Sequence, residues 1–139
     1  MGKLMVRDLM TEDVIALGPE DNLAKLRDLL YERGIRHMPI IDGDGQLVGL
    51  VSQRDLLRNS LVDQVNVPAA VEQAVLERLQ VRDVMTSGVV GVRPDLDIRE
   101  AAQLMLEHQY GCLPVVDGEG RLVGILTESD FVRLLARGN

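Results

Sequence analysis

The hexapeptide VRDLMT at residues 6–11 returns as VRDVMT at residues 81–86, an offset of 75 residues (81 − 6 = 75). With the same offset and no gap, DGDGQLVG at residues 42–49 falls on DGEGRLVG at residues 117–124. Self-similarity at a fixed spacing is the sequence signature of a repeated structural unit. The sequence therefore predicts a duplication, and the two copies are expected to have the same fold.

The composition is that of a globular protein with few aromatic side chains. Apolar residues make up 46% of the 139 residues, aromatic residues make up 2%, and the formal net charge is −7. Surfaces that stack bases use aromatic rings, and an acidic surface repels phosphate backbones, so nucleic-acid binding is not expected. The single cysteine, Cys112, fits a reducing compartment, and no apolar run is long enough for a signal peptide or a membrane span. We therefore expect a cytoplasmic protein.

The first half of each copy reads as a strand followed by a helix. In the first copy, residues 14–17 favour a short strand. Asn22 is a good N-cap for a helix whose leucines fall on one face. Gly34 is placed to end that helix in the left-handed conformation.

The second half of each copy reads as a hairpin followed by a helix. Residues 38–41 and 47–51 predict two strands, the second apolar enough for burial on both faces. The turn between them, residues 42–45, is expected to use its glycines for positive φ. Ser52 then starts a helix, so the order is β-α-β-β-α, and residues 89–135 repeat it.

This pattern divides the chain into a first repeat at residues 1–62, a connector at residues 63–80 and a second repeat at residues 81–139. The second half of the connector, residues 70–79, is predicted to be helical, with Pro68 near its first turn. The apolar stripe of this helix consists of Val71, Val75 and Leu79.

These motifs resemble the CBS (cystathionine-β-synthase) domain family. The resemblance rests on the VRDLMT-type segment, a proline-containing second strand, the Asp-Gly-x-Gly turn, and GLVSQRD at residues 49–55 matched by GILTESD at residues 124–130. It covers nearly the whole chain and implies a stand-alone tandem pair, a Bateman module. The implied fold class is α/β (α+β), with two β-α-β-β-α repeats packed pseudo-symmetrically through small mixed sheets.

Ser52-x-x-Asp55 and Thr127-x-x-Asp130 open the last helix of each copy. One interpretation is a capping box, in which hydroxyl and carboxylate satisfy backbone N–H groups reciprocally. By resemblance to the family, Asp55 and Asp130 would instead hold the hydroxyls of a ribose, while Ser52 and Thr127 would contact ribose or phosphate. A helix N-terminus also favours phosphate. The sequence leaves both interpretations open.

Arg36, His37 and Arg54 are the cations expected beside phosphate in the first copy, by resemblance to the family. Their alternative roles are solvated charges and, for His37, a half-buried strand residue. The second copy carries Gly111-Cys112 in place of Arg36-His37, so it has lost this basic pair. Arg133 is the candidate that could compensate there.

The resemblance also implies an adenine pocket in each copy. Strand packing and turn chemistry are alternative roles for the same positions. The pocket residues are Thr11, Val14, Met38, Pro39, Thr86, Val89, Leu113 and Pro114.

The implied function is regulation by an adenine nucleotide bound in the cleft between the two repeats. The basic residues favour a phosphate over a cationic sulfonium, so AMP or ADP is preferred and ATP is possible, with S-adenosylmethionine and NAD as alternatives. No catalytic group, metal site or required cofactor is expected. Expected partners are a second copy of the chain, forming a flat disc of four CBS units, and an unidentified protein. The alternative from another class is a protein-interaction adaptor with vestigial nucleotide sites.

Overall fold

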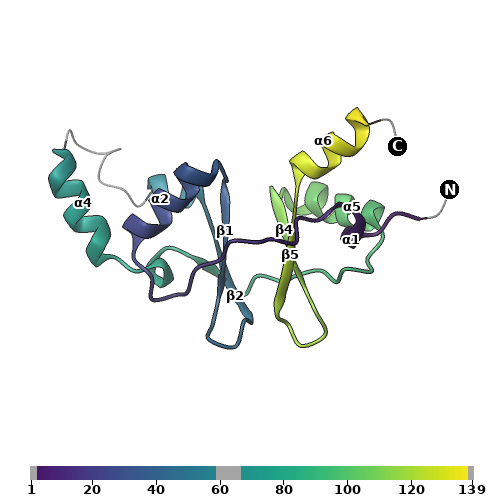
Figure 1. Ribbon diagram of the computed structural model, residues 1–139, viewed down its shortest axis with the longest axis horizontal. Helices are drawn as coiled ribbons and strands as arrows, with labels where there is room; N and C mark the ends of the chain where they lie inside the picture. Colours follow the sequence, from purple (N-terminus) through teal and green to yellow (C-terminus); the bar gives the residue numbers. More distant parts are fainter. Residues whose placement is uncertain (1–2, 59–66, 138–139) are drawn as a thin grey trace. The chain divides into compact units, whose positions relative to one another are not determined.

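The chain forms two compact units in a computed structural model that describes residues 3–58 and 67–137 (Figure 1). Unit 1 consists of Met1–Val14, Gly45–Leu47 and Val90–Asn139, and unit 2 consists of Ile15–Asp44 and Val48–Val89. Each unit therefore combines most of one repeat with a short segment from the other. The start of the predicted connector, residues 63–66, lies outside the described residues.

Unit 2 is built on a small three-stranded sheet in the order β1-β2-β3. Strands β2 and β3 are antiparallel, with Gly49 opposite Ser87 and Leu50 opposite Thr86. The sheet has helices on its flanks, and its hydrophobic core includes Leu26. The elements are α2 (Leu23–Arg33), β1 (His37–Ile41), β2 (Leu47–Ser52), α3 (Gln53–Arg58), α4 (Ala69–Arg78), a 3-10 helix (Val81–Asp83) and β3 (Thr86–Ser87).

Helix α2 begins and ends at the residues that the sequence predicts. The side chain of Asn22 accepts a hydrogen bond from the Lys25 N–H at 2.8 Å, which satisfies one of the free N–H groups of the first turn. Gly34 has a φ of 62°, the left-handed conformation that a residue without Cβ adopts at low cost. The leucine face of the helix packs into the core, with Leu23 and Leu26 fully buried.

Unit 1 repeats this plan with a two-stranded sheet. Strands β4 and β5 are antiparallel, with Cys112 opposite Thr127 and Leu113 opposite Leu126. Its core contains Leu126 and Val115, both fully buried. The elements are α1 (Val6–Leu9), α5 (Ile98–His108), β4 (Cys112–Val116), β5 (Leu122–Thr127) and α6 (Glu128–Ala136).

The two copies of the VRD motif are exchanged between the repeats. In unit 1, the Val6 N–H donates to the Leu96 carbonyl at 2.8 Å, and Val6 is fully buried in the core of the second repeat. In unit 2, the equivalent Val81 N–H donates to the Asp21 carbonyl at 2.8 Å, and Val81 is fully buried in the core of the first repeat. Each repeat therefore completes its core with the segment that opens the other repeat.

The predicted first strand of each repeat is reduced to a single parallel bridge. Residues 14–17 form no extended ladder, and Leu17 alone bridges to Ile40; in the second repeat, Val92 bridges to Val115. The N–H of Leu17 donates to the Pro39 carbonyl. A proline on an edge strand lacks an N–H group but its carbonyl still accepts a hydrogen bond. This carbonyl explains why residues 14–17 pair with β1 at Leu17.

Two further details of the hairpins differ from the prediction. Only the second glycine of each turn has positive φ, with 82° at Gly45 and 83° at Gly120. Strand β2 is not buried on both faces, because only Gly49 and Val51 are buried in it. The apolar run therefore reflects a half-buried strand in a small sheet rather than a central strand of a large one.

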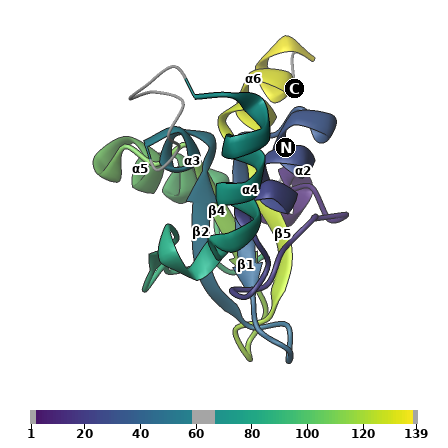
Figure 2. The ribbon, with the colours of Figure 1, turned by 90° about the vertical axis from the view of Figure 1, so that its left-hand side faces the viewer.

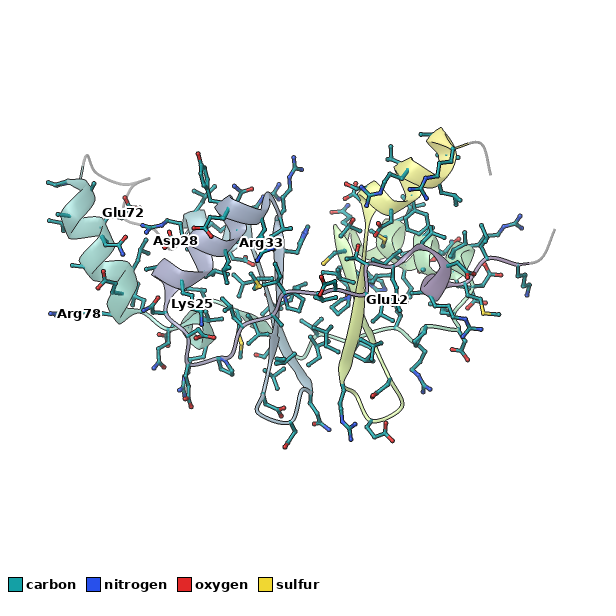
Figure 3. The ribbon with its side chains drawn as sticks, in the orientation of Figure 1. Glu12, Lys25, Asp28, Arg33, Glu72 and Arg78 are labelled. Carbon is teal, nitrogen blue, oxygen red and sulfur yellow. The ribbon has the colours of Figure 1, made fainter. Side chains whose placement is uncertain are left out.

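Helix α4 is helical as predicted, but its most buried residue lies outside the predicted stripe. Leu76 is 2% exposed and belongs to the core of unit 2. Of the predicted stripe, Leu79 is partly buried against the same core, whereas Val71 is 49% exposed. Helix α4 lies alongside α2 (Figure 2). In Figure 3, Glu72 extends on the side of α4 that faces α2, while Arg78 points away from it.

Candidate functional site

The carboxylate of Asp130 is held at the start of α6 in unit 1. Its Oδ2 accepts hydrogen bonds from the Thr127 N–H at 2.8 Å and from the Thr127 hydroxyl at 3.4 Å. Its Oδ1 accepts a hydrogen bond from the Arg133 guanidinium at 2.7 Å. The Asp130 side chain is 4% exposed, against 56% for Arg133. Both carboxylate oxygens are therefore engaged, and the capping box is present.

Asp55 has the equivalent place at the start of α3 in unit 2. Its Oδ2 accepts from the Ser52 N–H and from the Ser52 hydroxyl, both at 2.9 Å. The Asp55 N–H lies 3.1 Å from the Ser52 hydroxyl oxygen. The residue is half-buried, whereas Asp130 is buried. The capping interpretation thus holds in both copies, and in both it uses Oδ2.

The threonines of the exchanged segments pair with the strands that lead into these carboxylates. The Thr11 N–H donates to the Ile125 carbonyl at 2.9 Å, two residues before Thr127 on β5. Thr86 lies opposite Leu50, two residues before Ser52 on β2. Along the sequence Thr11 belongs with Asp55, but the fold places it with Asp130. Both threonines are exposed.

Two groups of predicted residues result, one in each unit. We name them by their carboxylates. The Asp130 site contains Thr11, Val14, Leu113, Pro114, Thr127, Asp130 and Arg133, all in unit 1. The Asp55 site contains Arg36, His37, Met38, Pro39, Ser52, Arg54, Asp55, Thr86 and Val89, all in unit 2.

The basic residues gather at the Asp55 site. The Gln53 N–H donates to the Arg36 carbonyl at 2.8 Å, which fixes the start of β1 against the first turn of α3. Arg36 and Arg54 are exposed, and His37, the first residue of β1, is half-buried. Cationic side chains beside a helix start form an electropositive surface suited to an anion.

The strand residues of the predicted adenine pocket are buried in the two cores. Met38 is fully buried and Leu113 is 2% exposed, while the side chains of Pro39 and Pro114 are fully buried. The carbonyls of these prolines accept hydrogen bonds from Leu17 and Val92. Met38, Pro39, Leu113 and Pro114 therefore pack inside the units, and their side chains offer almost no exposed surface.

The hairpin turn of unit 1 contains a carboxylate that the sequence analysis did not select. The Asp117 Oδ1 accepts from the backbone N–H groups of Arg121 at 3.0 Å and Glu119 at 2.9 Å. The Arg121 N–H bond, with the Glu119 N–H bond and the charges of Arg121 and Arg93, lowers the pKa of Asp117. This carboxylate stabilises a turn, as an Asx turn does.

Cys112 is a buried residue of the core rather than a reactive group. Burial raises the pKa of its thiol to about 12, so the thiol stays protonated at neutral pH. Within the described part of the chain, no three His, Cys, Asp or Glu residues are grouped in a way that would hold a metal ion. No helix in residues 3–58 or 67–137 has the length and apolar character needed to span a membrane.

A shallow apolar groove runs along α4 in unit 2. It is lined by Ala70, Val71, Ala74, Val75 and Arg78. None of these residues belongs to the Asp55 site or the Asp130 site, so the groove is a separate feature of the surface.

Two relatives of this chain differ in how much of their own length it covers. The uncharacterized protein MJ1426 of Methanocaldococcus jannaschii is 29% identical, over 95% of this chain and 91% of the relative. The CBS domain-containing protein CBSX1, chloroplastic, of Arabidopsis thaliana is 35% identical, over 95% of this chain and 64% of the relative. The chain thus spans most of the first relative and under two thirds of the second.

Three solved structures with the same fold contain adenosyl ligands. CBSX2 in complex with AMP is 32% identical, with a TM-score of 0.80 and coverage of 96% of both chains. The cytosolic domain of the Mg²⁺ channel MgtE in complex with ATP is 31% identical, with a TM-score of 0.71 over 91% of this chain and 46% of that one. The CBS domain pair of protein MJ0100, in complex with 5′-methylthioadenosine and S-adenosyl-L-methionine, is 25% identical, with a TM-score of 0.79 over 95% and 99%.

The family profile described as "CBS domain" matches the chain twice, at residues 6–62 and 81–137. These ranges contain both VRD motifs, both hairpins and both Asp-bearing helices of units 1 and 2. The chain belongs to the CBS domain family, as a tandem pair.

Proposed function

We propose that this chain is a regulatory module that binds an adenine nucleotide and catalyses no reaction. The proposal is supported by a feature that occurs twice: a carboxylate at a helix start follows a strand that pairs with an exposed threonine, Asp130 with Thr11 and Asp55 with Thr86. A ribose has two neighbouring hydroxyl groups, and both donate hydrogen bonds that a carboxylate accepts. The AMP and ATP complexes of CBSX2 and MgtE support this class of ligand.

AMP or ADP is the ligand that the charges favour, with ATP possible. Arg36 and Arg54 are exposed at the Asp55 site, and a cationic surface attracts phosphate and repels a sulfonium. These cations therefore disfavour S-adenosylmethionine relative to the nucleotides, although the MJ0100 pair contains it. NAD is the other alternative. A module that reads adenine nucleotides would act in energy sensing, in a cytoplasmic setting that the single cysteine fits.

Asp55→Ala is expected to weaken AMP binding to the Asp55 site about tenfold or more, because charge-assisted hydrogen bonds to the ribose are lost. Titration calorimetry of ligand-stripped protein with AMP, ADP, ATP, S-adenosylmethionine and NAD makes the measurement. Asp44→Ala is the matched control, since Asp44 is an exposed turn carboxylate outside both sites. If wild-type protein binds none of the five ligands, the proposed function is wrong.

We also propose that the chain forms a homodimer through α4, as a disc of four CBS units. The apolar groove of Ala70, Val71, Ala74 and Val75 is the support for this surface. Light scattering after gel filtration should give twice the 15.4 kDa chain mass, and Val71→Glu should shift the particle to the single-chain mass. A wild-type particle of 15.4 kDa would contradict the proposal.

The second candidate function is a protein-interaction adaptor whose nucleotide sites are vestigial. It is favoured by the capping boxes, which give Asp55 and Asp130 a structural role without any ligand. The lost basic pair at Gly111-Cys112 points the same way. Absence of nucleotide binding in the titration would favour this candidate over the first.

A further inference from the structure

Arg133 occupies the carboxylate oxygen that a ribose needs at the Asp130 site. The guanidinium donates to Oδ1 of Asp130 at 2.7 Å, while Thr127 holds Oδ2. The Asp130 side chain is 4% exposed, so its oxygens have little room for an additional donor. A ribose hydroxyl therefore reaches this carboxylate only if the guanidinium leaves Oδ1.

From this contact we propose that Arg133 determines which adenosyl ligands the Asp130 site accepts. The inference rests on the proposed function and concerns the same carboxylate. An uncharged adenosine must displace the guanidinium and offers it no new partner. A nucleotide also displaces it, but carries a phosphate on the same sugar, with which a released guanidinium forms charge-assisted hydrogen bonds. The Arg133–Asp130 ion pair of the ligand-free protein thus makes the site selective for phosphorylated ligands.

The exposure of Arg133 makes this exchange feasible. Its side chain is 56% exposed, so the guanidinium moves into water or towards a ligand without unpacking the core. Its ion pair is half-buried, and such a contact lies between a surface pair and a buried one in strength. Removing the guanidinium should therefore tighten adenosine binding by about fivefold, which corresponds to about 1 kcal/mol.

The test is made in the Asp55→Ala background, which leaves the Asp130 site for study. Arg133→Met keeps an apolar stem and removes the guanidinium. Calorimetry with adenosine should show binding about fivefold tighter than in the background protein, while AMP gains nothing. Arg58→Met is the matched control, because Arg58 lies at the equivalent helix position of the first repeat (133 − 75 = 58) and should leave both affinities unchanged.

The outcomes separate this inference from the proposed function. Adenosine affinity that is unchanged or weaker in Arg133→Met overturns the inference while AMP binding by the wild type still stands. If the Asp55→Ala protein binds no AMP although the wild type does, the Asp130 site holds no nucleotide and the inference is also wrong. Should Arg133→Met unfold, as judged by its thermal midpoint, Arg133→Lys replaces it, with adenosine binding expected about twofold tighter.

Discussion

Leu76→Ala should lower the free energy of unfolding by about 2–4 kcal/mol, because truncating a buried leucine loses its transfer free energy and leaves a cavity. Leu76 is 2% exposed and lies on α4 within the core of unit 2, together with Leu23 and Val81. Urea denaturation followed by circular dichroism measures the change. A loss of this size would show that the connector helix α4 is part of the core of unit 2 and does more than join the two repeats.

Leu106→Ala is the matched control for Leu76→Ala, because it makes the same truncation outside the proposed dimer surface. Leu106 lies on helix α5 and is 79% exposed. Its truncation should cost less than about 0.5 kcal/mol, as expected for a surface position. Equal small effects at the two positions would contradict the packing of α4 on the core of unit 2.

Gly124→Ala should destabilise the protein by about 1–3 kcal/mol, because a Cβ added there overpacks a filled site. This Cβ would lie 2.6 Å from the Met10 Sδ and 3.1 Å from the Thr11 carbonyl oxygen. The methionine can turn away, but the Thr11 backbone pairs with Ile125 and has less freedom. A displaced Thr11 should also weaken AMP binding at the Asp130 site, which the Asp55→Ala background isolates.

Two comparisons test whether the clash at the added Cβ causes the loss of stability in Gly124→Ala. Gly43→Ala is the glycine control, since a Cβ at the exposed Gly43 meets nothing within 4 Å and its φ is not positive. In a double-mutant cycle, Gly124→Ala and Met10→Ala together should cost less than the sum of the single changes, because the shorter side chain removes the Met10 part of the clash and leaves only the Thr11 contact. Additive effects would show that Met10 is not the residue that requires glycine. The equivalent pair, Gly49 and Met85, has the same 2.6 Å approach and should behave alike.

The residues of the candidate sites were predictable from the sequence, but which of them the fold places in the same unit was not. Ser52-x-x-Asp55 and Thr127-x-x-Asp130 are local patterns, and the structure shows the reciprocal hydrogen bonds that such spacing allows. The threonine associated with each carboxylate comes from the opening segment of the other repeat, and nothing near Thr11 in the sequence indicates that it pairs with Ile125. The Arg133–Asp130 ion pair joins residues i and i+3 of one helix, a spacing that the sequence alone reveals.

The sequence alone determined the duplication, the helix boundaries at Asn22 and Gly34, and the two hairpins, because these depend on hydrogen bonds and side-chain periodicity within a few residues. The packing of the folded chain establishes that Val6 and Val81 each lie in the core of the other repeat, and that Leu76 is the most buried residue of α4. Both choices depend on which apolar surface meets which across long separations in the chain. Such contacts are set by the packing of a whole core, which local sequence patterns do not encode.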